Sequence, residues 1–253
     1  MSQEIKLPKS WDEIYADQWV ELKKLDDEES SFFIRKIKIL AILTDTLPDD
    51  EKWEDLDVEE LTKLIDEIKW LKYEPSNEFK KIIDDFTCID INKLKLGEFI
   101  DLEYFFSESY IDNIFKICAI LYRKTKKDEW GHLLYEPYHL IDINERSKYF
   151  EDLPISYIFG IIKYYLDFKE TIISTYQLLF EPIINEDDIE EEIVEYDPEE
   201  QEQIKKEEIL TKWGWENVIY KLSNSDITKY DDITNLPLIF VLNHLSYMKD
   251  LNL

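Results

Sequence analysis

The side chains best suited to metal chemistry are the three histidines, His132, His139 and His244. No two of them have the HxxxH spacing that places two ligands on one turn of a helix. The only local group of possible ligands is His132 and His139 with Glu136, in residues 124–144, which we predict to be a loop. We expect this loop to be polar and metal-free, with a metal site as the alternative.

Acid–base catalysis needs a carboxyl group in an apolar pocket, or one that shares a proton with a neighbouring carboxyl group. Adjacent acidic residues are expected by chance in a chain with 58 Asp and Glu residues. Asp84 and Asp85 come closest to the requirement because they lie between apolar runs. Residues 79–91 are also rich in β-branched and aromatic side chains. We therefore predict a small β-hairpin with these two aspartates in its turn, and catalysis as the alternative.

Motifs for a nucleophile or for nucleotide binding are missing from the sequence. The four glycines lie far apart, whereas a loop that binds phosphate needs several of them close together. There is no GxSxG or HExxH motif, and Cys88 and Cys118 lie in apolar or mixed segments as expected for buried thiols of a reducing compartment. We predict a protein that is not an enzyme, with no catalytic residue, no cofactor and no metal.

The charge of the chain limits the partners that it can bind. The 58 acidic and 30 basic residues give a formal net charge of −28. This argues against binding to nucleic acids or anionic membranes, which requires clustered Lys and Arg, and favours a basic protein partner. The start of the chain lacks the apolar core of a signal peptide, and no run reaches about 18 apolar residues. We therefore expect a cytoplasmic protein.

The spacing of apolar residues predicts a mainly α-helical fold with ample core material, since 44% of the residues are hydrophobic. Ser10 is predicted to cap the first short helix, with Glu13 completing the capping box. The next helix, around Phe33 to Ala41, has only a narrow polar edge and is expected to be central to its domain. Further helices are predicted over residues 58–71, 97–106, 110–123 and 154–180.

The composition changes at Asn185. From Asn185 to Glu208 there are thirteen acidic residues and two lysines, with very few apolar side chains. We predict a solvated linker at 185–208 between a helical main domain, 1–184, and a small C-terminal helical domain, 209–253. The acidic run is either a spacer or an electrostatic attractant for a basic partner.

The C-terminal segment is predicted to contain two amphipathic helices, one beginning near Trp215 and one near Leu238. These 45 or so residues are short for an independent core, so we expect them to dock on the first domain or on a partner. Trp213 and Trp215 either pack internally or anchor a partner. The candidate partner-binding residues are Trp213, Trp215, Leu238, Val241, Leu242, Leu245 and Met248.

Several segments together resemble a known family. They are, in order, WDEIYADQWVELKKL, KIKILAILTDTLPDD, LKLGEFIDLEYFF, NIFKICAILYRKTKKDEWGHLLYEPY and ERSKYFEDLPISYIFGIIKYYLDF. This order resembles tail-assembly-chaperone-like or tail-associated proteins of bacteriophages, particularly phages of Bacteroidetes hosts. The segment WGWENVIYKLSNSDITKYDDITNLPLIFVLNHLSYMKD resembles the short distal domain that such chaperones carry after a linker.

The resemblance implies a non-enzymatic protein that keeps the tape-measure protein or other tail subunits soluble in the host cytoplasm during infection. Such chaperones often produce the second domain by ribosomal frameshifting, whereas here one continuous chain encodes it. The resemblance also allows a structural or packaged virion protein. A third alternative, based on charge alone, is an acidic DNA mimic that inhibits a DNA-binding protein.

Overall fold

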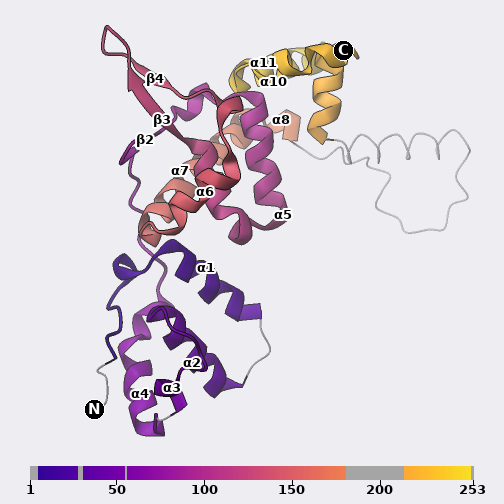
Figure 1. Cartoon of the computed structure of the whole chain (residues 1–253). Coiled ribbons are helices and arrows are strands. Elements are labelled where there is room, and N and C mark those ends of the chain that lie inside the picture. The colour runs from indigo at the N-terminus through magenta and orange to yellow at the C-terminus, as the bar shows by residue number, and fades with distance from the viewer. Residues whose placement is uncertain (1–4, 28–30, 55, 181–213, 252–253) are drawn as a thin grey trace, which may run out of the picture. The chain divides into compact units, whose positions relative to one another are not determined.

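The computed structural model describes residues 5–27, 31–54, 56–180 and 214–251 (Figure 1). These residues are mainly helical with one small antiparallel sheet, as the sequence predicted. They form two compact units: unit 1 comprises Met1–Ile89 and Tyr104–Asp167, and unit 2 comprises Asp90–Glu103 and Phe168–Leu253. The linker predicted at 185–208, together with both of its boundaries, lies outside the described residues and stays a prediction.

The helices of unit 1 are η1 (Trp11–Glu13), α1 (Ala16–Lys24), η2 (Leu25–Asp27), α2 (Phe32–Leu43), α3 (Glu51–Glu54), α4 (Val58–Glu67), η3 (Lys69–Lys72), η5 (Tyr138–Leu140) and α6 (Ile143–Glu151). They include those predicted near Trp11, Phe33 and Val58, and also α3, η5 and α6, which the sequence did not predict. Helices α5 (Leu96–Leu121) and α7 (Ile155–Thr175) contribute residues to both units. Ser109 interrupts α5 with extended backbone, which gives two helical segments as predicted.

The start of α4 shows how local sequence determines a helix boundary. The Asp57 side chain accepts a hydrogen bond from the Glu60 backbone N–H at 2.8 Å, and the Glu60 side chain accepts one from the Asp57 N–H at 3.3 Å. This capping box satisfies two backbone donors that a helix start leaves free. The predicted cap at Ser10 is wrong: its side chain makes no capping hydrogen bond, and the Gln18 side chain instead binds the Tyr15 N–H at the start of α1.

Helix α2 is less central than its composition predicted. Leu40, Ala41 and Leu43 at its C-terminal end are buried, whereas Phe32 and Phe33 at its start are 73% and 45% exposed. Residues 35–39 are half-buried, so the covering of the helix increases toward its C-terminal end. Apolar composition therefore identified a packing helix but not how much of it is covered.

The sheet of unit 1 contains β1 (Ile82–Ile83), β2 (Phe86–Cys88), β3 (Tyr122–Lys127) and β4 (Leu133–Tyr135), in that order. All neighbours are antiparallel. Asp84 and Asp85 form the turn between β1 and β2, with Asp84 in the left-handed region at φ 48°. Aspartate tolerates this conformation better than most residues, and the predicted hairpin is confirmed.

The predicted loop at 124–144 is wrong in its first half. The helix expected to reach Arg123 ends at Leu121, and the chain continues as β3, turns and returns as β4. Cys88 lies opposite Tyr122 and Thr87 lies opposite Arg123, so β2 provides the partner that makes this segment a strand. Pairing between distant segments therefore determined the local structure here.

Aliphatic side chains make up most of the core of unit 1, and aromatic side chains pack among them. Trp19 packs edge-on against Phe159 with ring centroids 5.1 Å apart, and Tyr122 meets Phe150 in the same manner at 5.8 Å. Cys88 and Cys118 are buried and free, as predicted. Burial raises the pKa of the Cys88 thiol to about 12 and also raises the pKa of Cys118. Both thiols are therefore protonated at neutral pH and are poor nucleophiles.

Two carboxyl groups of α1 have raised pKa values that imply a dependence of stability on pH. Burial raises the pKa of Glu21 first, followed by repulsion from Asp17 and Asp45. A raised folded-state pKa of an acid means that stability is lost as the pH rises through that pKa. We expect Glu21→Gln to raise the melting temperature near pH 7 and to change nothing well below the ordinary pKa of 4.5.

Thermal unfolding followed by circular dichroism at both pH values measures this effect. Glu59→Gln is the matched control, because Glu59 is exposed and pairs with Lys63 at 3.0 Å. The control is expected to produce no gain at either pH. A lower melting temperature of Glu21→Gln near pH 7 would contradict the prediction.

Candidate protein-binding groove

Backbone hydrogen bonds join the C-terminal segment to an earlier part of unit 2. The Leu238 N–H donates to the Leu94 carbonyl at 2.8 Å, and the Leu96 N–H donates to the Leu236 carbonyl at 2.9 Å. These bonds place the start of α11 (Leu238–Asp250) beside η4 (Ile91–Lys93) and the beginning of α5. The short segment thus packs on preceding residues, which supply a core that it could not form alone.

The structure divides the predicted partner-binding residues into two groups. Leu238, Val241 and Leu242 are 0%, 1% and 1% exposed and belong to the core of unit 2, and Leu242 also lines a groove. Residues 214–222 are helical, and Trp215 in this helix packs edge-on against Phe99 with ring centroids 5.5 Å apart. Trp213 lies outside the described residues. The other predicted residues, Trp215, Leu245 and Met248, line the same groove as Leu242.

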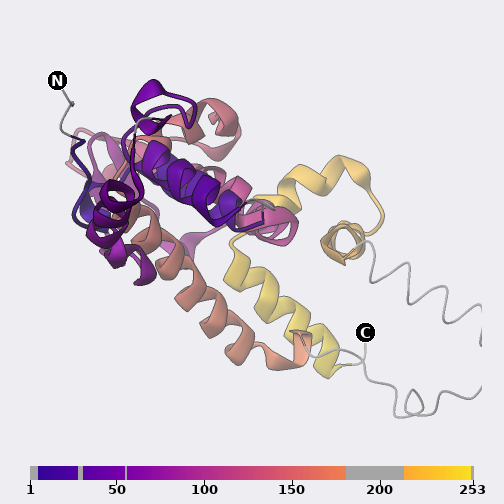
Figure 2. The same ribbon diagram turned by 90° about the horizontal axis from the view of Figure 1, so that it is seen from below.

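This groove has a volume of about 440 Å³. Its walls come from α8 (Gln177–Phe180), the helix at 214–222 and α11. Figure 2 shows α8 beside α11, in agreement with the contacts between these helices. The lining residues are Leu179, Phe180, Gly214, Trp215, Val218, Lys221, Leu222, Leu242, Leu245, Met248 and Lys249. Eight of these eleven residues have apolar side chains, so the groove suits apolar side chains of a ligand.

Two polar contacts fix α11 against the end of the preceding helices. The Tyr176 hydroxyl donates to Asn243 Oδ1 at 2.9 Å, and the Lys249 ammonium donates to the Leu178 carbonyl. A cation at a helix C-terminus is favourable because the carbonyls there carry partial negative charge. The two walls are therefore held together by bonds that do not use the apolar lining.

The groove lies next in sequence to the most acidic part of the chain. Phe180 and Gly214, two lining residues, flank residues 181–213, which include the thirteen acidic residues and two lysines of 185–208. Charge of this density attracts cations over about one Debye length, ~8 Å at physiological ionic strength. An apolar ligand thus suits the lining, whose charged residues are Lys221 and Lys249, and basic flanks of that ligand suit the acidic residues next in sequence.

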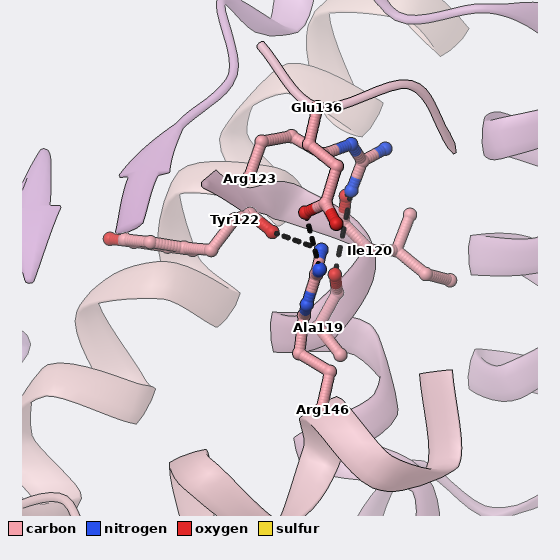
Figure 3. Close-up of polar contacts among 6 residues, drawn as sticks. All are labelled: Ala119, Ile120, Tyr122, Arg123, Glu136 and Arg146. Atoms are coloured by element: carbon pink, nitrogen blue, oxygen red, sulfur yellow. Dashed lines mark hydrogen bonds and ion pairs between the residues drawn. The ribbon is translucent and has the colours of Figure 1, made fainter. Parts of the chain in front are cut away.

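Unit 1 contains a cluster of buried arginines that sequence reasoning missed (Figure 3). Arg123 is 1% exposed and donates to the carbonyls of Ala119 and Ile120 at the end of α5. Its guanidinium also lies over the ring of Tyr138, 4.9 Å from the ring centroid. The arginine therefore satisfies the final carbonyls of a helix in a buried place, which is a structural role.

Arg146 forms the other half of this cluster. Its guanidinium donates to the Tyr122 carbonyl at 3.4 Å and pairs with the Glu136 carboxylate (Figure 3). The side chains of Arg146 and Glu136 are only 8% and 25% exposed. The pair joins α6 to the residue that follows β4. The pairing of Arg146 with Glu136 depends on the return of the chain through β4, so the local sequence does not distinguish Arg146 from a surface arginine.

The structure does not bring together the residues that could have bound a metal. His132 Nδ1 lies 3.0 Å from Asp128 Oδ2, and Glu136 is paired with Arg146. Within the described ranges, no group of three or more His, Cys, Asp or Glu side chains could hold a metal ion. Asp84 accepts a hydrogen bond from the Tyr149 hydroxyl at 2.5 Å, which links the hairpin turn to α6.

In the part of the chain that the structure describes, no helix combines the length and apolar character needed to cross a membrane. Comparisons with protein-family models, with curated proteins and with solved structures found no match.

Proposed function

We propose that this chain is a non-enzymatic binding protein that holds a basic amphipathic helix of another protein in the groove of unit 2. The observation that carries the proposal is an apolar groove flanked in sequence by an acidic segment. In the setting suggested by the sequence resemblance, the bound helix belongs to a phage tape-measure or tail protein, and the chain acts as a tail-assembly chaperone.

The physical basis is the recognition of a helix by a groove. An amphipathic helix presents apolar side chains at positions i, i+3, i+4 and i+7, which enter an apolar groove while its polar face stays in water. Leu245 and Met248 are three positions apart on α11 and are half-buried. Anchor side chains of the ligand would complete the burial of both residues. Attraction to the acidic segment would accelerate association and weaken as salt increases.

The direct test uses the full chain and a synthetic helical probe. The probe has leucines at i, i+3, i+4 and i+7 and lysines on its opposite face, and a second peptide contains the same residues in scrambled order. We expect calorimetry to show binding of the first peptide, no binding of the scrambled one, and weaker binding at higher salt. In the double variant Leu245→Asp, Met248→Asp, we expect binding of the probe to weaken at least tenfold, because a charged side chain cannot be buried unpaired at low cost.

Phe240→Asp is the matched control, because Phe240 lies on the same helix, is 60% exposed and does not line the groove. Equal binding by wild type and the double variant, or an equal loss in the control, would contradict the proposal. The role in tail assembly has a separate test, which is co-purification with the tape-measure protein combined with absence from purified particles. Abundant copies in finished particles would instead identify a virion protein.

A further inference from the structure

The outer end of the sheet in unit 1 is a two-stranded arm. Strand β2 pairs with residues 122–124 of β3 only, so residues 125–135 consist of the rest of β3, a turn and β4. Figure 1 shows this arm extending beyond α6. β4 is the last strand in the sheet order, and its outer edge has no partner strand among the described residues. An isolated two-stranded hairpin is marginally stable in water, so a partner that covers it would stabilise it.

Strand β4 and the residues just before it lack the charged side chains that usually protect an edge strand. Native edges carry charged residues or proline, which prevent pairing with another chain. Here residues 130–135, WGHLLY, contain no Asp, Glu, Lys or Arg, in a chain that is 35% charged. Trp130, Leu133, Leu134 and Tyr135 are 80%, 45%, 55% and 37% exposed.

The backbone of β4 also offers N–H and C=O groups that pair with no other strand among the described residues. The Asp128 N–H donates to the His132 carbonyl at 3.0 Å, and the Glu136 N–H donates to the Lys124 carbonyl at 2.9 Å. In an antiparallel ladder, successive residues direct these groups to opposite sides. The backbone N–H and C=O groups of Leu134 therefore point toward β3, whereas the backbone N–H and C=O groups of Leu133 and Tyr135 point toward the open edge.

We propose that β4 pairs with β4 of a second copy of this chain, antiparallel about a twofold axis. This pairing places Leu134 opposite the second copy's Leu134, and Leu133 opposite the second copy's Tyr135. The outward N–H and C=O groups of Leu133 in one copy then form hydrogen bonds with those of Tyr135 in the other copy. The two four-stranded sheets become one continuous sheet. Such an interface is self-complementary, as a twofold contact requires.

The distribution of charge favours a second copy as the occupant. Two molecules with a net charge of −28 repel each other, so their contact is least opposed where the surface is not acidic. Strand β3 carries no acidic residue, and its exposed side chains are those of Lys124, Lys126 and Lys127. These positive charges lie beside β4, where they attract the acidic remainder of the second copy.

The acidic groups near the arm are largely engaged. Asp128 accepts from the backbone N–H groups of Trp130 and His132, and Glu136 pairs with Arg146. Glu129, in the turn, is exposed. The contact area of one short strand is small, so we expect a weak, concentration-dependent dimer.

The test is sedimentation velocity of the full chain over a range of concentrations. Wild type is expected to shift from monomer to dimer as its concentration rises. Leu134→Lys and Leu134→Glu are each expected to weaken the dimer at least tenfold, because two like charges would face each other on the axis. An equimolar mixture of these two variants is expected to restore the dimer, since Lys and Glu would then face each other.

Ile227→Lys and Ile227→Glu are the controls, because Ile227 is 75% exposed in unit 2. They are expected to associate like wild type, and circular dichroism checks that every variant is folded. Amide hydrogen exchange adds a readout specific to the edge. Protection at Leu133 and Tyr135 should increase with concentration, while protection at Leu134 should not.

Three results would overturn the proposal. They are a wild type that stays monomeric at every concentration, a dimer that persists in Leu134→Lys, and a mixture of the charged variants that does not dimerise. If wild type stayed monomeric and a strand of another protein were found bound to the arm, the open edge of β4 would be a binding site for that protein. None of these results affects the groove of unit 2, since the arm variants leave its lining unchanged.

Discussion

Replacing Gly160 by alanine is expected to destabilise unit 1 strongly, even though alanine favours a helix by about 1 kcal/mol over glycine. A Cβ atom at position 160 of α7 would lie 2.4 Å from the carbonyl oxygen of Glu78 and 2.6 Å from the backbone nitrogen of Phe79. These are backbone atoms, so no side-chain rotation can relieve the clash. We expect a loss of about 3 kcal/mol, the upper part of the usual range for overpacked sites, measured by urea unfolding.

Gly97→Ala provides the comparison in another helix. A Cβ atom there would lie 3.2 Å from the Thr234 side chain and 3.3 Å from the Thr234 carbonyl oxygen, so a shift of a few tenths of an ångström would relieve the contact. We therefore expect a much smaller loss for Gly97→Ala than for Gly160→Ala. Equal stability of Gly160→Ala and wild type would show that α7 does not approach residues 78–79 as closely as described.

The second large effect is expected from Arg146→Met. This change removes the partner of Glu136 and a hydrogen bond to the Tyr122 carbonyl. Removing one partner of a buried ion pair leaves the other charge uncompensated and typically lowers the free energy of unfolding by about 3–5 kcal/mol. Glu136 is 25% exposed, so we expect about 3 kcal/mol, the lower end of that range. Urea unfolding followed by circular dichroism measures the loss.

A second substitution separates the unpaired charge from lost packing. Adding Glu136→Gln to Arg146→Met removes the charge and is expected to recover most of the lost stability. Lys163→Met is the control, since the exposed pair of Lys163 with Asp167 should contribute little. If the double variant were no more stable than Arg146→Met alone, the unpaired charge would not be the cause.

Local patterns in the sequence were sufficient for some elements. The apolar spacing and the capping residues Asp57 and Glu60 define the start of α4 without any tertiary contact. Asp84 and Asp85 marked the turn of the first hairpin for a similar reason, because short acidic side chains suit a turn between β-branched residues. These features depend on residues only a few positions apart.

Other features depend on partners far away in the chain. The sequence predicted a helix to Arg123 followed by a loop, but residues 122–127 form a strand because they pair with β2 and β4. Likewise, Leu238 and Leu245 belong to one apolar stripe, yet Leu238 is buried by the core of unit 2 and Leu245 lines the groove. Spacing along a helix identifies its apolar face but not which part of that face the rest of the fold covers.

Unit 2 is built from two segments that lie far apart in the chain, and this separation affects how the unit forms during synthesis on the ribosome. Leu94, Leu96, Phe99 and Leu102 are synthesised long before the α11 residues with which they share a unit. At about 5–20 residues per second, translation of the intervening chain takes on the order of ten seconds. Throughout that interval the nascent polypeptide must carry these apolar side chains without the helix that completes their unit.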